Sequence, residues 1–115
     1  MSQDCLFCRI VSGEIPATIV YRDEKVVAFR DINPQAPTHI LLIPTIHIPD
    51  LLHLSIEQNE LLGHIFSRAA QLAREEGIAE DGFRLLANTG PAAGQTVLHL
   101  HFHLLGGRSL GWPPG

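Results

Sequence analysis

The chain has 115 residues, a length that suits one domain with a single core and excludes a catalytic domain joined to a separate regulatory domain. Apolar residues make up 45% of the sequence and charged residues 17%, which excludes a disordered or collagen-like chain. The net charge of -4 argues against electrostatic binding to a nucleic acid polymer or an anionic membrane, so an anionic ligand must be held by local contacts. Seven histidines are the outlier of the composition.

No segment predicts membrane insertion or secretion. The longest uninterrupted apolar run, residues 40–43, is far shorter than the roughly 18 residues of a membrane-spanning helix. The first residues lack the basic and apolar regions of a signal peptide. We therefore expect a cytoplasmic protein.

The first half of the chain predicts a short helix, a hairpin and a buried strand. The helix is expected over residues 6–12, because a glycine follows as its C-terminal cap. Two β-branched and aromatic runs, residues 18–21 and 25–29, predict the hairpin. The prolines of residues 31–37 predict a loop, and the nearly all-apolar run 39–43 predicts a central strand covered on both faces.

The second half predicts one long helix and two further strands. The helix is expected over residues 55–76, since Ser55 and Gln58 form a capping box. His64 falls roughly opposite the apolar stripe of this helix and is expected in solvent. Strands are expected over residues 83–87 and 98–105, which indicates an α+β fold with a mostly antiparallel five-stranded sheet. The apolar stripe consists of Leu61, Leu62, Ile65, Phe66, Ala69, Leu72 and Ala73.

Residues 98–105 read L-H-L-H-F-H-L-L, so His99, His101 and His103 are predicted on one strand face. Residues two apart on a strand are ~6.6 to 7 Å apart, and the outer two histidines are ~13 Å apart. The outer pair therefore cannot ligate one metal ion unless the strand bends, which indicates two different tasks. A row of imidazoles facing one cleft indicates acid/base and nucleophilic chemistry near neutral pH. Leu98, Leu100, Phe102 and Leu104 are predicted on the opposite, core-facing side.

The motif H-L-H-F-H-L-L at residues 99–105 resembles the signature of the histidine triad (HIT) superfamily. Four further motifs resemble its HINT branch of nucleotide-binding proteins. They are D-I-N-P-Q-A-P-T-H at 31–39, G-Q-T-V at 94–97, L-G-G-R at 105–108 and W-P-P-G at 112–115. The resemblance implies a single HIT domain over residues 1–115, with one long and one short helix. It also implies a homodimer that extends the sheet, with the segment near Trp112 reaching towards the partner subunit's site.

The resemblance also implies a reaction. His101 would attack the α-phosphorus of a nucleotide to form a nucleotidyl-histidine, which water then hydrolyses. His103 would lie over the phosphate, His39 would be a further active-site histidine, and the hydroxyl of Thr96 would serve the leaving group. The expected activity is hydrolysis of the P–N bond of purine nucleoside 5′-phosphoramidates, with the small nucleotide as the ligand.

The loop over residues 88–96 is a candidate phosphate site, because Gly90 and Gly94 allow backbone N–H groups to converge on an anion. A carboxylate at residue 31 suits a ribose diol, and apolar neighbours suit the face of a base. By resemblance, the phosphate and leaving-group contacts are assigned to Asn88, Gly94, Gln95 and Thr96, and the nucleoside contacts to Ile15, Phe29, Asp31 and Ile32.

Cys5 and Cys8 form a C-x-x-C motif, which supplies half of a zinc site. His99 is the spare member of the triad, and His47 follows the end of the neighbouring strand. The resemblance implies the same four ligands. We expect a structural Zn²⁺ that pins the N-terminal helix to the sheet and is not required for the chemistry; the alternative is two free thiols. No organic cofactor is expected.

Three other functions stay open at this point. A dinucleoside polyphosphate hydrolase would share every catalytic residue. A non-catalytic nucleotide-binding or scaffolding module would bind nucleotide without turnover. A histidine-rich metal-handling protein would bind several labile metal ions and no nucleotide.

Overall fold

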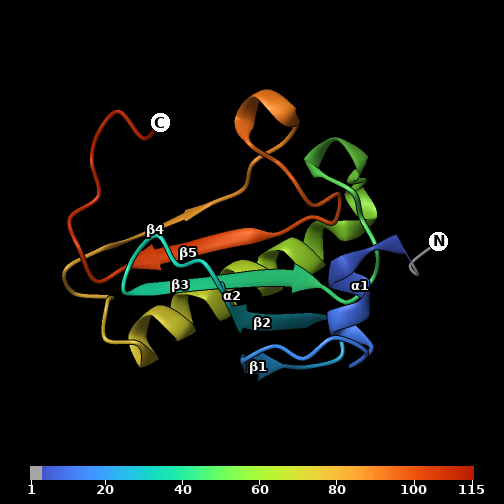
Figure 1. Cartoon of the computed structure of the whole chain (residues 1–115), viewed down its shortest axis with the longest axis horizontal. Coiled ribbons are helices and arrows are strands. Elements are labelled where there is room, and N and C mark those ends of the chain that lie inside the picture. The colour runs from blue at the N-terminus through green and yellow to red at the C-terminus, as the bar shows by residue number, and fades with distance from the viewer. Residues whose placement is uncertain (1–3) are drawn as a thin grey trace.

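Five antiparallel strands form one sheet in the order β1-β2-β3-β5-β4, in a computed structural model that describes residues 4–115 (Figure 1). This confirms the predicted α+β class and the five-stranded sheet. The expected hairpin is present, each of its strands beginning one residue later than predicted. The strands are β1 (Ile19–Arg22), β2 (Val26–Arg30), β3 (Thr38–Pro44), β4 (Phe83–Leu86) and β5 (Phe102–Gly106).

Strand β3 lies in the middle of the sheet, and all seven of its residues are buried, as its apolar sequence predicts. Because side chains alternate across a strand, β3 contributes to two separate core layers. Ile40 and Leu42 pack in the layer that contains α2 (Asn59–Glu75), which runs along one face of the sheet (Figure 1). Leu41 and Ile43 pack in the layer that contains α1 (Leu6–Val11). The small helix α1 therefore covers the face of the sheet that α2 does not.

Both predicted helices are present. Gly13 follows α1 with a φ of +86°, a left-handed conformation that suits glycine. The predicted capping box of Ser55 and Gln58 is present, but it caps a 3₁₀ turn (Ile56–Gln58) that leads into α2. Two side chains of α2 differ from prediction. Phe66 is 48% exposed, and His64 is only half-exposed because its Nε2 lies 2.6 Å from Oδ2 of Asp23 in the hairpin turn.

The predicted strand over residues 98–105 is too long at its start, because β5 begins at Phe102. The pairing of Leu42 with Phe102 would place Leu100 opposite Pro44, which has no N–H to donate to a ladder. The N–H of Leu100 instead donates to the carbonyl of Ile48 at 2.6 Å. Leu98, predicted in the core, is 64% exposed, whereas Leu100 is buried as expected. Phe102 and Leu104 are buried as well.

The described residues, 4–115, include no helix that has both the length and the apolar character needed to cross a membrane.

Candidate active site and metal centre

Three histidines meet on the α1 face of the sheet where β3 and β5 lie side by side. His39 lies on β3 and His103 on β5, and Nε2 of His39 is 2.9 Å from Nδ1 of His103. His101 precedes β5, and its ring centre is 5.1 Å from that of His103. The structure therefore brings these three predicted site residues together. Two of them lie on neighbouring strands, and His101 lies just before the start of β5.

A directed series of hydrogen bonds sets where His103 carries its proton. The backbone N–H of Gln35 donates to Nδ1 of His39 at 3.0 Å, so Nδ1 has no proton and the neutral ring carries it on Nε2. That Nε2–H donates to Nδ1 of His103, which leaves the proton of His103 on its own Nε2. This Nε2 is buried and has no hydrogen-bond partner among the described residues. Hence His103 holds one free N–H donor.

Burial keeps both of these histidines neutral at neutral pH. Burial, with a smaller contribution from the nearby His101 and His39, lowers the pKa of His103 to about 4. Burial also lowers the pKa of His39, although the carboxylate of Asp31 acts in the opposite direction. Neutral imidazoles in fixed tautomers are what the hydrogen-bond series requires.

His101 has the opposite arrangement of proton and lone pair. Its Nδ1 lies 2.7 Å from the backbone carbonyl of His99, which can only accept, so Nδ1 carries the proton. Nε2 is then left with a free lone pair, as a nitrogen nucleophile requires. The imidazole is 7% exposed, and the edge-on ring of Phe7 lies 5.1 Å away. Two adjacent histidines thus offer a lone pair and an N–H donor.

A cavity of about 390 Å³ opens beside these rings. Asp31 stands in its wall, with Oδ1 already accepting from the N–H of Asn33 at 2.8 Å. Ile32 also lines the cavity and is fully exposed. Phe7, Leu41 and Val97 line it too, which sequence reasoning did not identify. The predicted site residues in the wall are Ile15, Phe29, Asp31, Ile32, Thr96, His101 and His103.

The other predicted loop residues lie outside this wall. Gly90 and Gly94 have φ values of +88° and +90°, which only glycine adopts readily, on either side of a 3₁₀ turn. The Gln95 side chain is buried and braces the loop: its Oε1 accepts from the N–H of Gly90, and its Nε2 donates to the carbonyl of Pro49. Asn88 and Gly94 are not among the residues that line the cavity.

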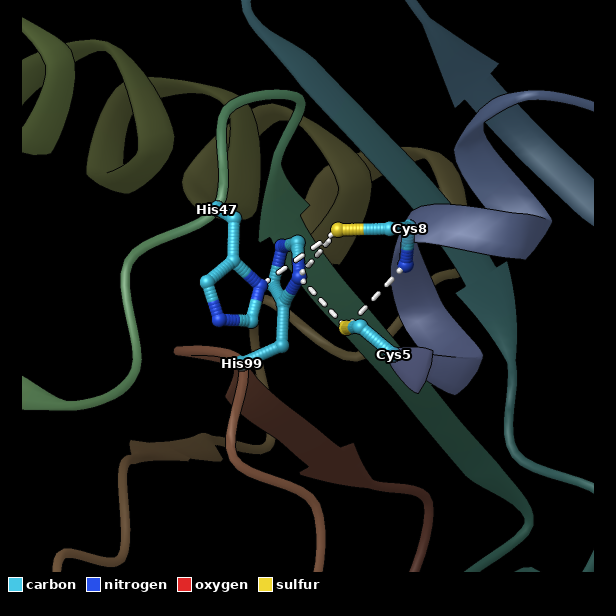
Figure 2. Close-up of side chains that lie close together, drawn as sticks. All are labelled: Cys5, Cys8, His47 and His99. Carbon is cyan, nitrogen blue, oxygen red and sulfur yellow. Dashed lines mark hydrogen bonds between the residues drawn. The ribbon is translucent and has the colours of Figure 1, made fainter. Parts of the chain in front are cut away.

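The four predicted metal ligands lie together (Figure 2). Their donor atoms all lie within 4.8 Å of one another. Nδ1 of His99 is 3.2 Å from Sγ of Cys5 and 3.5 Å from Sγ of Cys8, and Nδ1 of His47 is 3.4 Å from Sγ of Cys8. Ligands of a tetrahedral zinc ion are separated by about 3.3 to 3.8 Å, given the usual Zn–S and Zn–N bond lengths. Two of the three separations lie within this range and the third, 3.2 Å, lies just below it, so the cluster has the size that a zinc ion needs.

The protonation of this cluster also fits a metal. Nε2 of His99 is 2.9 Å from the carbonyl of Pro44 and donates to it, which turns the lone pair of Nδ1 towards the two sulfur atoms. Burial, followed by the interaction with Cys5, raises the pKa of the Cys8 thiol to about 11 in the protein without metal, so a metal ion would have to displace the thiol proton. A Cys₂His₂ set is a donor combination typical of structural zinc.

A second group of close donors, Asp31, His39 and His103, does not fit a metal in the same way. A metal on Nε2 of His39 would need the proton on Nδ1, where the N–H of Gln35 already donates. We therefore interpret this group as a hydrogen-bond network.

The HIT domain family matches residues 12–110 of the chain. The purine nucleoside phosphoramidase of Escherichia coli is 54% identical over 111 residues, which cover 96% of this chain and 93% of that protein. The 14 kDa zinc-binding protein of Zea mays is 51% identical over 96% of this chain and 87% of its own. The crystal structure of a HIT family hydrolase from Legionella pneumophila superposes with a TM-score of 0.96 at 53% identity, covering 97% of this chain and all of that one.

Proposed function

The chain belongs to the HIT domain family and is a hydrolase of that family; on this premise, we propose that it cleaves the P–N bond of purine nucleoside 5′-phosphoramidates. The observation that carries the proposal is the pair of opposite tautomers at His101 and His103. One ring offers a lone pair to phosphorus, and the next offers an N–H to an oxygen on that phosphorus. The E. coli phosphoramidase, at 54% identity, supports the substrate class.

In the proposed reaction, Nε2 of His101 forms a bond to the α-phosphorus and the P–N bond breaks. The carbonyl of His99 holds Nδ1–H of His101 while the ring becomes positive. Nε2–H of His103 donates to a phosphate oxygen, whose charge grows in the transition state. Thr96, an exposed residue of the cavity wall, is assigned to the leaving amine, whose nitrogen takes up a proton from solvent as it departs. Water then attacks phosphorus and gives up a proton to solvent, the bond between phosphorus and Nε2 breaks, and the nucleoside monophosphate and neutral His101 are released.

The nucleoside occupies the 390 Å³ cavity in this proposal. Asp31 accepts hydrogen bonds from the ribose hydroxyls. Ile15 and Phe29 pack against the base, and Ile32 covers it from the solvent side. The predicted contacts of Asn88, Gly94 and Gln95 are retained as proposals, in which Gln95 acts by bracing the loop rather than by touching phosphate.

Mass spectrometry of protein quenched during turnover of adenosine 5′-phosphoramidate tests the proposal. We expect an adduct of nucleoside monophosphate mass on His101, and no adduct on the His101→Ala variant. Faster turnover of diadenosine polyphosphates than of the phosphoramidate would favour the dinucleoside polyphosphate hydrolase. Nucleotide binding without turnover or adduct would favour the non-catalytic module.

We further propose that Cys5, Cys8, His47 and His99 hold a structural Zn²⁺, which joins α1 to the sheet. The zinc-binding relative from Zea mays and the donor geometry support it. Metal analysis should find one zinc per chain in the wild type and none in Cys8→Ser. Zinc far below one per chain in metal-replete wild type would favour free thiols. Because this thiol pair needs a reducing compartment, we place the protein in the cytoplasm.

Finally, we propose a homodimer formed through β4 and α2. β4 is an edge strand, and the shallow apolar cavity beside it is lined by Leu62 and Phe66 of α2 and by Leu85 and Leu86 of β4. Exposed apolar surface of this kind marks interaction sites. Sedimentation analysis should give a dimer for the wild type and a monomer for Phe66→Lys, whereas a monomeric wild type contradicts the proposal.

A further inference from the structure

Helix α1 takes part in both the metal centre and the active site. Cys5 is its N-cap, with Sγ accepting from the N–H of Cys8 at 3.3 Å, and Cys8 lies one turn further along. Phe7, between the two cysteines, is 5% exposed and points into the core on the sheet side. Both residues that separate the two cysteines in the sequence, Leu6 and Phe7, line the nucleotide cavity.

Two separate contacts connect the metal centre to the nucleophile. The first is the backbone of His99, whose side chain faces the cysteines while its carbonyl accepts from Nδ1 of His101 at 2.7 Å. The second is the ring of Phe7, which packs edge-on against the imidazole of His101 at 5.1 Å and 88°. The same ring lies 6.0 Å from His99 and 5.5 Å from Phe29. Phe7 thus fixes one side of the His101 ring.

The cavities beside the two sites share part of their walls. A second cavity of about 580 Å³ is lined by Cys5 and His47 of the metal centre. Thr96 and Val97 line this cavity as well as the nucleotide cavity. A displacement of α1 would therefore change the surroundings of the reacting phosphorus.

Helix α1 has six residues, which is too short for a stable helix without tertiary contacts. At its N-terminal end, Cys5, Phe7 and Cys8 pack in the core layer on this face of the sheet. The two cysteines also contact His99 and His47, which lie just outside the strands. A metal ion bonded to both cysteines would hold that end far more firmly than thiol hydrogen bonds.

We propose that the Cys₂His₂ centre positions the nucleophile: with metal bound, α1 holds the Phe7 ring and the His99 carbonyl against the His101 imidazole, and Phe7 is a positioning residue. This inference rests on the proposed function. It goes beyond a metal that only stabilises the fold, because it predicts an effect of the metal on turnover. The metal ion takes no part in the chemical step.

Nitrogen-15 NMR of the histidine rings tests the positioning directly and does not depend on activity. At one fixed pH, zinc-loaded protein should show a single slowly exchanging Nδ1–H for His101. After chelation the signal should broaden or vanish, and the ring nitrogens should show a mixture of tautomers. In parallel, kcat should fall about tenfold with KM changed less than twofold, since the site stays formed but loses its alignment. An unchanged Nδ1–H signal and unchanged kcat in zinc-free protein would overturn the inference.

Phe7→Leu separates positioning from metal loss. This variant should keep one zinc per chain and still lose kcat about fivefold, because leucine has no ring edge to place against His101. Arg9→Ala, on the exposed side of the same helix, is the matched control and should keep both zinc and kcat. Full kcat in zinc-loaded Phe7→Leu would contradict the role of Phe7. If the loaded protein hydrolyses no phosphoramidate at all, the proposed function fails, while the NMR comparison still decides the inference.

Discussion

The candidate active site and the candidate metal centre both use histidine, but for different chemistry, and the histidines compared lie within residues 99–103. His99 turns Nδ1 towards two sulfur atoms, because its Nε2 donates to the Pro44 carbonyl. His101, two residues later in the wall of the cavity, keeps the lone pair of Nε2 free, because its Nδ1 donates to a backbone carbonyl. The two roles differ in which ring nitrogen carries the proton and donates to a backbone carbonyl. The partner of the second nitrogen thus decides whether a histidine serves as ligand or nucleophile.

The largest effect is expected at the proposed nucleophile. His101→Ala removes the atom that would form the covalent bond, and kcat should fall by about 10⁴. Nucleotide binding should persist, because the other cavity residues remain. Steady-state kinetics with a phosphoramidate, together with calorimetric titration of a nucleoside monophosphate, measure both quantities. His53→Ala, a histidine outside both sites, is the control; His101→Ala activity within tenfold of wild type would rule out His101 as nucleophile.

The next effect concerns the tautomer of His103. His39→Ala removes the donor to Nδ1 of His103, and kcat should fall roughly 10- to 100-fold because the Nε2–H is no longer fixed. His39→Gln should recover part of this loss, since the amide nitrogen of glutamine lies near the position of Nε2 and can donate. Ring nitrogen-15 shifts of His103 report the tautomer. Equal activity of the two variants would show that the hydrogen bond does not matter.

The sequence predicts a structural feature well when its cause lies within one segment of the chain, and poorly when the cause lies in a distant segment. The capping box of Ser55 and Gln58 and the buried strand β3 follow from patterns within one segment, and both are present, although the box caps the 3₁₀ turn before α2. The predicted start of the last strand was wrong because pairing at Leu100 would need an N–H from Pro44 on the neighbouring strand β3. The predicted full exposure of His64 was wrong for a similar reason, because its partner Asp23 belongs to the hairpin turn.

The site shows the same division. Motif spacing predicts the C-x-x-C cysteines, which the structure places beside His47 and His99. No local pattern identifies Phe7, because its contact with His101 joins residues 94 positions apart. Its one signal is its place between two candidate ligands. The directed series of hydrogen bonds that begins at Gln35 cannot be predicted from the sequence either, since the first donor is a backbone N–H.

At the metal centre the expected effect is on stability. Cys8→Ser removes a proposed zinc ligand and leaves α1 held by its remaining contacts, at a cost of roughly 2 to 3 kcal/mol and a Tm lower by about 10 °C. Thermal melts with and without chelator measure it. The chelator should lower the Tm of the wild type and leave that of Cys8→Ser unchanged. If the chelator leaves the Tm of the wild type unchanged, no metal stabilises the protein.

The smallest effect is the pH dependence that the buried active-site histidines impose. Burial lowers the pKa of His103 to about 4, whereas an unfolded histidine has a pKa of about 6.5. Below about pH 6.5, His103 therefore binds a proton in the unfolded chain but not in the folded protein. The free energy of unfolding falls as the pH drops from about 6.5 to 4. After allowance for solvent screening, His103 should account for roughly 1 kcal/mol of this fall. Urea unfolding of wild type and His103→Gln isolates its share: the variant should lose less stability over that range, and parallel curves would mean that His103 titrates alike in both states.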